Sequence, residues 1–172
     1  MNYKQALQNP IFKVISESAK QLNLECYVIG GFVRDFILQR GSAKDIDVVA
    51  IGSGIELAKQ VAKNLSTKPK VQIFKTYGTA MLEFDGIEIE FVGARKESYS
   101  ENSRNPVVEN GTLEDDQNRR DFTINALALD LHPDNFGALL DPFGGIKDLE
   151  SKVIKTPLNP DITYSDDPLR ML

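Results

Sequence analysis

Two aspartates on one expected strand are the first residues whose spacing indicates chemistry. Asp45 and Asp47 stand two apart in KDIDVVAIG, residues 44–52, so both carboxylates point to the same face of that strand. On an otherwise apolar strand two such acids repel each other and are costly to desolvate unless a cation lies between them. Hard divalent ions, magnesium above all, prefer oxygen ligands of this kind. Taken alone, an Asp-x-Asp is more often a pair of solvated acids at the start of a strand.

The segment just before this strand offers a place for an anion. An apolar run that ends at Ile29 passes into Gly30 and Gly31 and then into an expected helix, with Arg34 one turn further on. The glycines would leave bare backbone N–H groups at the positive end of the helix dipole, which suits a phosphate. Alone they are more often a tight turn, and the spacing matches neither a P-loop nor a dinucleotide-binding motif. Because the Asp45 strand follows directly, a phosphate site and a metal site are expected at one end of one sheet.

A third carboxylate would complete a site for two magnesium ions. Glu88 and Glu90 alternate with apolar residues in IEIEFV, residues 87–92, and share one face of that expected strand. We prefer Glu90, which lies nearer the end of the strand, and the alternative is a solvated hairpin face. Two magnesium ions held by three acids would suit in-line nucleotidyl transfer, because one ion activates the attacking hydroxyl and the other holds the triphosphate.

A basic cluster follows later in the chain. Arg119 and Arg120 stand beside Asp121, and Asn125 lies one turn further on. Such a group could bind a ribose hydroxyl and a phosphate. The alternative is an exposed basic helix face with a capping aspartate.

The last nine residues, YSDDPLRML, contain a pair of groups that could select a base. Asp167 and Arg170 are three apart at the start of an expected helix, hence on one side of it. A carboxylate only accepts hydrogen bonds and a guanidinium only donates them. Cytosine and adenine both present an amino donor beside a ring-nitrogen acceptor, whereas uracil and guanine present the reverse. The pair would therefore accept C and A. The alternative is an ordinary salt bridge within a helix, which would contribute only about 0.3–0.5 kcal/mol to stability.

The positions of these residues depend on elements that the apolar pattern predicts. Apolar residues at helical spacing predict three helices, and short apolar or alternating runs predict five strands. Asp85-Gly86, between the last two strands, is a strong signal for a hairpin turn. Helices alternating with strands, then strands in succession, predict an α/β or α+β domain with a mixed sheet. The helices are expected at 10–22, 31–39 and 54–65, and the strands at 25–29, 44–52, 71–76, 79–84 and 87–92.

The rest of the chain predicts a long loop and further helices. Residues 95–111 are polar and without a period, which indicates a functional or disordered loop. Thr112, with Asp115 three residues on, resembles a capping box that opens a helical segment through 118–129. A strand, a turn and a short helix are expected at 139–149, and a new helix capped by Ser165 at 164–172.

Composition limits the class of protein. The chain has 172 residues, 41% apolar and 26% charged, with no apolar stretch near the eighteen or so that a membrane-spanning helix needs. The N-terminus lacks the form of a signal peptide, so a cytoplasmic protein without a membrane partner is expected. Cys26 lies in an expected strand, where a buried small hydrophobe is the expected role, and the single histidine, His132, argues against a zinc site. The net charge of −5 argues against a broad nucleic-acid surface.

Five ordered segments of the chain are GGFVRD, DID, LEDDQNRRDFTINALA, LLDPFGGIKDL and DDPLRML. Together they resemble one family, the head of the class II tRNA nucleotidyltransferases, or CCA-adding enzymes, with the related bacterial poly(A) polymerases. The resemblance runs from about Tyr27 to the last residue and implies a polymerase β-like nucleotidyltransferase head. The implied roles are triphosphate contact for Gly31 and Arg34, magnesium binding for Asp45 and Asp47, nucleotide contact for Arg120 and its neighbours, and base selection for Asp167 and Arg170.

The family implies a function for the chain. A magnesium-dependent head of this kind would add CMP and AMP, from CTP and ATP, to the 3′ end of tRNA and release pyrophosphate. Poly(A) polymerase, partial addition of C or A alone, and a catalytically silent nucleotide-binding module are the alternatives. Residues 1–150 would form the head, and residues 151–172 a linker and the beginning of a helical neck. The tRNA would be gripped mostly by regions beyond this sequence, which accounts for the acidic charge. Asp166 stands where the family usually has Glu.

Overall fold

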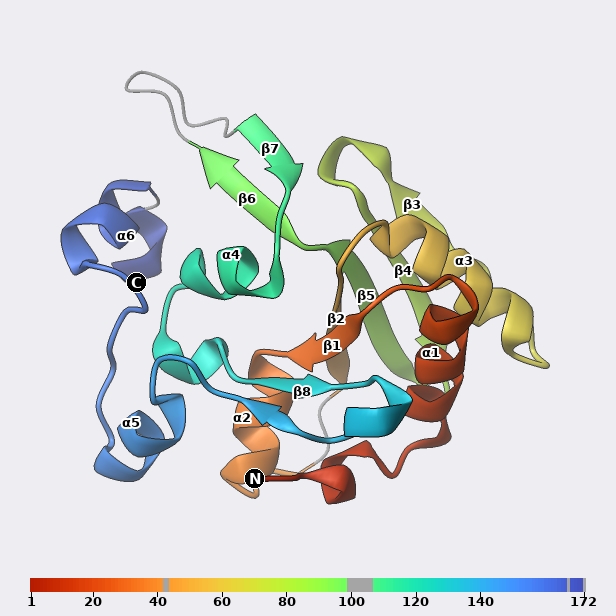
Figure 1. The fold of residues 1–172 in the computed structure, drawn as a ribbon, viewed down its shortest axis with the longest axis horizontal. Coiled ribbons are helices and arrows are strands. Elements are labelled where there is room, and N and C mark those ends of the chain that lie inside the picture. The colour runs from red at the N-terminus through yellow and green to blue at the C-terminus, as the bar shows by residue number, and fades with distance from the viewer. Residues whose placement is uncertain (42–43, 99–106, 167, 172) are drawn as a thin grey trace.

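A seven-stranded mixed sheet organises the molecule (Figure 1). The computed structural model describes residues 1–41, 44–98, 107–166 and 168–171. The strand order in the sheet is β3-β4-β5-β2-β1-β8-β9, and β6 and β7 form a separate two-stranded hairpin. The strands are β1 (Cys26–Ile29), β2 (Asp45–Ala50), β3 (Gln72–Phe74), β4 (Thr79–Phe84), β5 (Ile87–Gly93), β6 (Arg95–Ser98), β7 (Val107–Asn110), β8 (Ala128–Asp130) and β9 (Leu139–Leu140).

The described residues form six α-helices and five 3₁₀ turns in addition to the strands. Asn9 caps the first helix by accepting from the Ile11 N–H, and Ser53 caps the third by accepting from the Glu56 N–H. The α-helices are α1 (Pro10–Gln21), α2 (Gly31–Ile37), α3 (Gly54–Asn64), α4 (Leu113–Asn118), α5 (Gly145–Ser151) and α6 (Pro160–Asp166). The 3₁₀ turns are Lys4–Leu7, Lys75–Tyr77, Thr123–Asn125, Pro133–Asn135 and Pro168–Met171.

One face of the sheet carries the main hydrophobic core. The helices α1 and α3 lie side by side over it, and alternate residues of β2 and β5 point toward them, among them Ile46, Val48 and Phe91. Helix α3 packs directly on β5, because a Cβ placed on Gly54 would lie 2.7 Å from the Val92 backbone carbon. Most of the apolar burial that stabilises the domain is therefore on this face.

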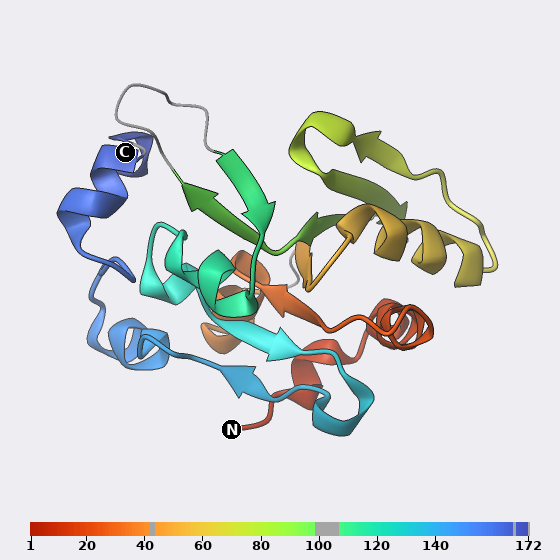
Figure 2. The same cartoon turned by 45° about the horizontal axis from the view of Figure 1, so that its top comes forward.

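The opposite face carries a smaller apolar cluster and the acidic residues. Tyr27, Ile29, Val49 and Ala94 belong to this cluster, and Leu113 of α4 packs against it. The two-residue period of a strand puts Asp45 and Asp47 on the same face as Val49, beyond the apolar cluster. Figure 2 shows the β6–β7 hairpin on the α4 side of the molecule, and α4 contacts β6.

Most predicted elements of the first two thirds are present, with small shifts of their ends. The two aspartates lie at the start of a strand that pairs in parallel with β5 and antiparallel with β1, so the sheet is mixed as predicted. Cys26 is buried in β1 as expected, and burial raises the pKa of its thiol to about 12.

Three predictions for the second half were wrong. Part of 95–111 is the β6–β7 hairpin rather than a loop. The helical segment expected through 118–129 ends at Asn118, and the chain then forms a 3₁₀ turn and β8, because the antiparallel edge of β1 pairs with 128–130. Ser165 lies inside α6 rather than capping a helix, since that helix already begins at Pro160. Non-local pairing overrides local propensity in the second case.

No α-helix among the described residues is both long enough and apolar enough to cross a membrane.

Candidate active site

The acids of β2 stand beside those of β5. Asp45 is paired with Glu88 and Asp47 with Glu90 in the parallel register, so the four carboxylates project from one face of the sheet. Asp45 and Glu88 are exposed, whereas Asp47 and Glu90 are half-buried. Glu90 is therefore the acid that lies beside Asp47 on the neighbouring strand.

Asp47 is held among charges of both signs. Burial raises the pKa of its carboxyl, and the negative charges of Glu90, Asp116 and Asp45 raise it further, while the Arg120 guanidinium lowers it; the pKa is raised overall. The ionised form of Asp47 is thus less favourable here than in water. A cation bound at this carboxylate would relieve that penalty.

The glycine turn lies directly against Asp47. Gly30 has a φ of +83°, a region that residues with a Cβ rarely adopt. A Cβ at Gly30 would lie 3.1 Å from Arg120 Nη1 and 3.5 Å from Asp47 Oδ2. The Gly30 N–H donates to the Leu127 carbonyl at 3.0 Å. Gly30 therefore allows close approach of the two side chains, and its own N–H is not the bare donor that the sequence predicted.

Arg34 is tied to groups on both sides of the turn. Its guanidinium donates to both carboxylate oxygens of Asp35, at 2.8 and 3.0 Å, and its Nη1 donates to Asn125 Oδ1 at 2.6 Å. The hydrogen bond from Arg34 lowers the pKa of Asp35. The Arg34 side chain remains 25% exposed, which leaves part of it accessible to an anion. A Cβ at Gly31 would lie 3.6 Å from its Nη2.

Asn125 joins the two arginine-bearing segments. Its amide nitrogen donates to both carboxylate oxygens of Asp121, at 3.0 and 3.2 Å, and its backbone oxygen accepts from Arg120 Nη1 at 3.5 Å. Its side-chain oxygen accepts from Arg34, as described above. One amide therefore links α2 to the turn after α4.

The turn that carries Asn125 rests on α5. The Thr123 hydroxyl donates to Asp148 Oδ2 at 2.6 Å, and a Cβ on Gly145 would lie 2.5 Å from the Thr123 carbonyl oxygen. Asp141 accepts from the Gly145 and Ile146 N–H groups and so fixes the start of α5. The segment LLDPFGGIKDL thus supports the site without contributing to it directly.

Asp116 is a site residue that sequence reasoning missed. Its Oδ1 accepts from Arg119 Nε and Nη2 at 3.0 and 2.7 Å, and its Oδ2 accepts from Arg120 Nε and Nη2 at 3.3 and 3.2 Å. Its side chain is 0% exposed. The signal available in the sequence was its spacing, three and four residues before the two arginines, which puts all three side chains on one side of a helix.

A sequence profile of the Poly A polymerase head domain matches residues 26–155. The chain belongs to this family. Among its relatives, the A-adding tRNA nucleotidyltransferase of Aquifex aeolicus (strain VF5) is 41% identical over 149 residues, 87% of this chain and 18% of that protein. The CCA-adding enzyme of Lactobacillus helveticus (strain DPC 4571) is 33% identical over 162 residues, 92% of this chain and 37% of that protein.

Solved structures share the fold of this head domain. An apo CCA-adding enzyme superposes with a TM-score of 0.87 at 32% identity, over 99% of this chain and 41% of the other. A tRNA nucleotidyltransferase in complex with a primer tRNA and an incoming ATP analog superposes with a TM-score of 0.78 at 37% identity, over 91% of this chain and 42% of the other. The fold class and the family expected from the sequence are confirmed. The head domain described here spans less than half the length of these relatives.

Two groupings expected from the sequence are not seen among the described residues. Asp167 lies outside the described residues, and Arg170 lies in the 3₁₀ turn Pro168–Met171, so their pairing stays a prediction. Among the described residues, no three His, Cys, Asp or Glu side chains gather closely enough to form a metal-binding group. Asp45, Asp47 and Glu90 are neighbours on the sheet, but they do not form a closed cage.

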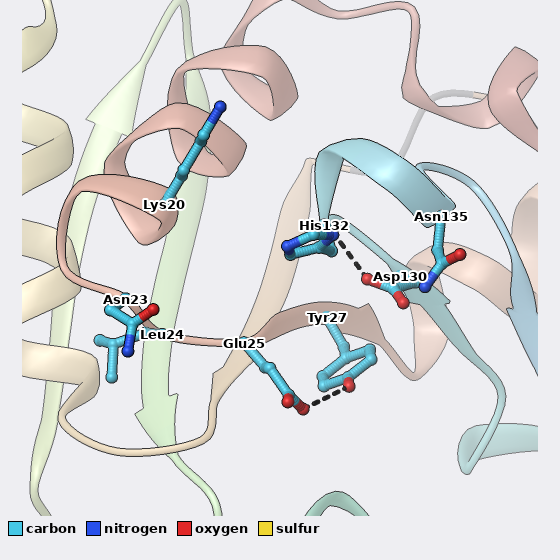
Figure 3. Close-up of a pocket in the computed structure, with 8 residues that line it drawn as sticks. All are labelled: Lys20, Asn23, Leu24, Glu25, Tyr27, Asp130, His132 and Asn135. Carbon is cyan, nitrogen blue, oxygen red and sulfur yellow. Dashed lines mark hydrogen bonds between the residues drawn. The ribbon is translucent and has the colours of Figure 1, made fainter.

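Two cavities lined by described residues lie away from the acids of β2 and β5. A pocket of about 440 Å³ lies at the other end of β1 from Gly30 (Figure 3). There the Tyr27 hydroxyl donates to Glu25 at 3.0 Å, and the His132 N–H donates to Asp130 at 2.7 Å. A groove of about 520 Å³ between α2 and α5 is lined by Arg34 but not by Asp47. Neither of these two cavities is lined by the acids of β2 and β5.

Proposed function

We propose that this head domain catalyses nucleotidyl transfer to the 3′ end of tRNA, adding CMP and AMP from CTP and ATP and releasing pyrophosphate. The observation that carries the proposal is that Asp47 and Arg120 both approach Gly30, so that an acid suited to a cation and an arginine suited to a phosphate meet at one turn. Relatives named A-adding tRNA nucleotidyltransferase and CCA-adding enzyme support the same reaction. A tRNA substrate also agrees with the cytoplasmic location expected from the sequence.

Magnesium is the proposed cofactor, bound as two ions by Asp45 and Asp47 with Glu90 as the third carboxylate. The donor set fits hard cations, because oxygen ligands from neighbouring strands share one face. Burial and nearby acids raise the pKa of Asp47, because the ionised carboxylate is costly in this position. A divalent cation would remove that cost. When bound, magnesium would neutralise the triphosphate and activate the attacking hydroxyl.

The side chains around the glycine turn are proposed to bind the nucleotide. Guanidinium groups bind phosphate oxygens through paired hydrogen bonds. Arg34 donates to the side-chain oxygen of Asn125, and Arg120 donates to its backbone oxygen. Asp121 accepts from the Asn125 amide and could accept from a ribose hydroxyl as well. Asp167 and Arg170 are proposed to select the base. The other proposed nucleotide contacts are Gly30, Gly31, Arg34, Arg119, Arg120, Asp121 and Asn125.

We also propose the division of the chain that the sequence indicated, with a head at 1–150 and a linker with the start of a helical neck at 151–172. Apolar side chains that remain exposed along the second segment support it, because a segment that packed only on the head would bury them. They are Val153, Ile154, Leu158, Ile162 and Leu169.

Addition of AMP alone is a second candidate for the reaction. Three relatives that are 34% to 41% identical to this chain are named A-adding tRNA nucleotidyltransferases. The pairing argument for Asp167 and Arg170 admits both C and A, so it does not separate the two reactions. Poly(A) polymerase and a silent nucleotide-binding module remain alternatives that an assay distinguishes.

The test is an extension assay with magnesium on two RNAs, a tRNA that lacks its whole CCA end and a tRNA that ends in CC. Each RNA receives CTP alone, ATP alone, both, or UTP and GTP. The assay uses this chain and, in parallel, the native polypeptide that contains it. CCA addition needs both nucleotides on the first RNA, whereas A-only addition extends only the second RNA, by one residue.

The other outcomes contradict the proposal. A long A tail would indicate a poly(A) polymerase. Extension that persists in Asp47→Ala would remove Asp47 from the reaction. Tight nucleotide binding without extension of either RNA, in the native polypeptide as well as in this chain, would favour the silent module. Incorporation of U or G as readily as C or A would argue against base selection by Asp167 and Arg170.

A further inference from the structure

We propose that Asp116 is a positioning residue that holds the guanidinium of Arg120 at the Gly30 turn for the triphosphate. The inference rests on the proposed function, because it concerns how the same nucleotide site is prepared. Asp116 is 0% exposed and is the only acidic residue in the buried class among the described parts of the chain. A buried carboxylate is costly unless its oxygens are paired, and here both oxygens are paired with arginines.

The geometry gives one carboxylate two cations. Asp116 Oδ1 is used by Arg119 and Oδ2 by Arg120, each through two nitrogen atoms of the guanidinium. Arg119 is the C-cap of α4 and Arg120 follows it, and the spacings of three and four residues bring both arginines to Asp116. Within this cluster of three residues, one negative charge against two positive charges leaves a net positive charge, which suits a triphosphate.

The direction of Arg120 depends on this pairing. Only 17% of the Arg120 side chain is exposed. Its Nη1 lies 3.5 Å from the Asn125 carbonyl oxygen and would lie 3.1 Å from a Cβ placed on Gly30. An arginine without such a partner has many rotamers, and fixing it on binding costs free energy. Arg120 Nη1 and Asp47 Oδ2 both lie beside Gly30, at 3.1 and 3.5 Å from a Cβ placed there, so Asp47 is a second acid near Arg120. Asp116 thus keeps Arg120 from closing over the acids that the proposed cation needs.

The experiment measures binding of ATP and of inorganic tripolyphosphate to this chain and to four variants. Asp116→Asn is expected to weaken tripolyphosphate binding at least about ten-fold, because a hydrogen-bonded charge is lost from the pair. Arg120→Ala should weaken it by a similar factor, and the double variant should be no weaker than Arg120→Ala by more than about two-fold. Asp130→Asn is the matched control, a half-buried acid that accepts from a backbone N–H far from the site, and it should bind as the unsubstituted chain does.

If Asp116 acts by positioning Arg120, the loss of binding in the double variant is smaller than the sum of the two single losses. A merely structural role for Asp116 would make the two losses add. Additive losses in the double variant, or an equal loss in Asp130→Asn, would overturn the proposal. If Asp116→Asn does not fold, Arg120→Lys replaces it, since a lysine keeps the charge but cannot span Asp116 Oδ2 and the Asn125 carbonyl. Tripolyphosphate binding near the Arg120→Ala level would support the proposal, and full binding would overturn it.

Proton exchange at Arg120, measured without any ligand, tests the role of Asp116 separately from the proposed function. If the unsubstituted chain bound neither ATP nor tripolyphosphate, the proposed nucleotide site would fail. The Arg120 Nε–H signal in NMR spectra of the ligand-free chain would still decide the role of Asp116. Slow exchange of that proton, lost in Asp116→Asn but kept in Asp130→Asn, is the expected result. Equal protection in Asp116→Asn would overturn the proposal.

Discussion

At the scale of single residues, Asp47 is the carboxylate that a bound cation would relieve most, and its charge lowers the stability of the folded chain. The strand places it beside Glu90, burial disfavours its charge, and Arg120 offsets only part of that effect, so its pKa is raised in the folded chain. A carboxyl whose pKa is raised by folding binds its proton more tightly in the folded state than in the unfolded state. Stability therefore falls as the pH rises from the ordinary pKa of 3.8 through the raised value, and the loss is complete above it.

Asp47→Asn should accordingly stabilise the chain while it abolishes nucleotidyl transfer. Without divalent cations at neutral pH, we expect a higher melting temperature for Asp47→Asn than for the unsubstituted chain, because the amide carries no charge to desolvate. The difference should shrink as the pH falls toward the ordinary aspartate pKa. Thermal unfolding followed by circular dichroism across this range measures both effects.

Asp45→Asn is the control for this prediction, since Asp45 is exposed on the same strand face and its substitution should change stability by less than about 0.5 kcal/mol. Added magnesium should raise the melting temperature of the unsubstituted chain more than that of Asp47→Asn. A lower melting temperature for Asp47→Asn at neutral pH would mean that the attraction between the Asp47 carboxylate and the nearby Arg120 charge outweighs the cost of burial.

At the scale of elements, the spacing of apolar and polar residues along each segment decides what could be predicted. Asp45 and Asp47 stand out because strand alternation puts two acids on one face, and the glycines stand out because they separate an apolar run from a helix. The strand β8 was missed, since its residues follow a helical pattern and only pairing with β1 and β9 fixes them as a strand. Asp116 was missed for a similar reason, because burial depends on tertiary packing whereas most acids beside arginines are solvated.

Helix α3 offers a test of how the scaffold supports the acids. A methyl group on Gly54 would lie 2.7 to 2.8 Å from backbone atoms of Phe91 and Val92, on the strand that also carries Glu90. Gly54→Ala should therefore lower the free energy of unfolding by about 1–3 kcal/mol, because backbone must shift to accept the Cβ. Urea unfolding measures this loss. Glu56→Ala, on the exposed side of the same helix, should cost less than about 0.5 kcal/mol; equal effects would mean that the contact between α3 and β5 is not tight.

At the scale of the whole molecule, charge is distributed unevenly. The chain carries 25 acidic and 20 basic residues, yet Arg34, Arg119 and Arg120 belong to one hydrogen-bonded network around the glycine turn. A triphosphate needs only a few cations close together. A tRNA acceptor end needs phosphate contacts spread along its length, and the binding energy comes from the counterions those contacts release. Nucleotide binding and tRNA binding by this chain should therefore differ sharply.

We expect this chain alone to bind tRNA no more tightly than non-specific complexes, with a Kd of about 10⁻⁴–10⁻⁶ M at physiological salt. Fluorescence anisotropy of labelled tRNA lacking its CCA end measures this binding, and ATP binding by the same preparation shows that the site is folded. The ATP affinity should change with salt much less than the tRNA affinity, because fewer phosphates are involved. Arg40→Ala, which removes a cation that is 66% exposed beside the site, should alter neither by more than about two-fold. Submicromolar tRNA binding by this chain would instead place a continuous basic surface on the head itself, in spite of its net charge of −5.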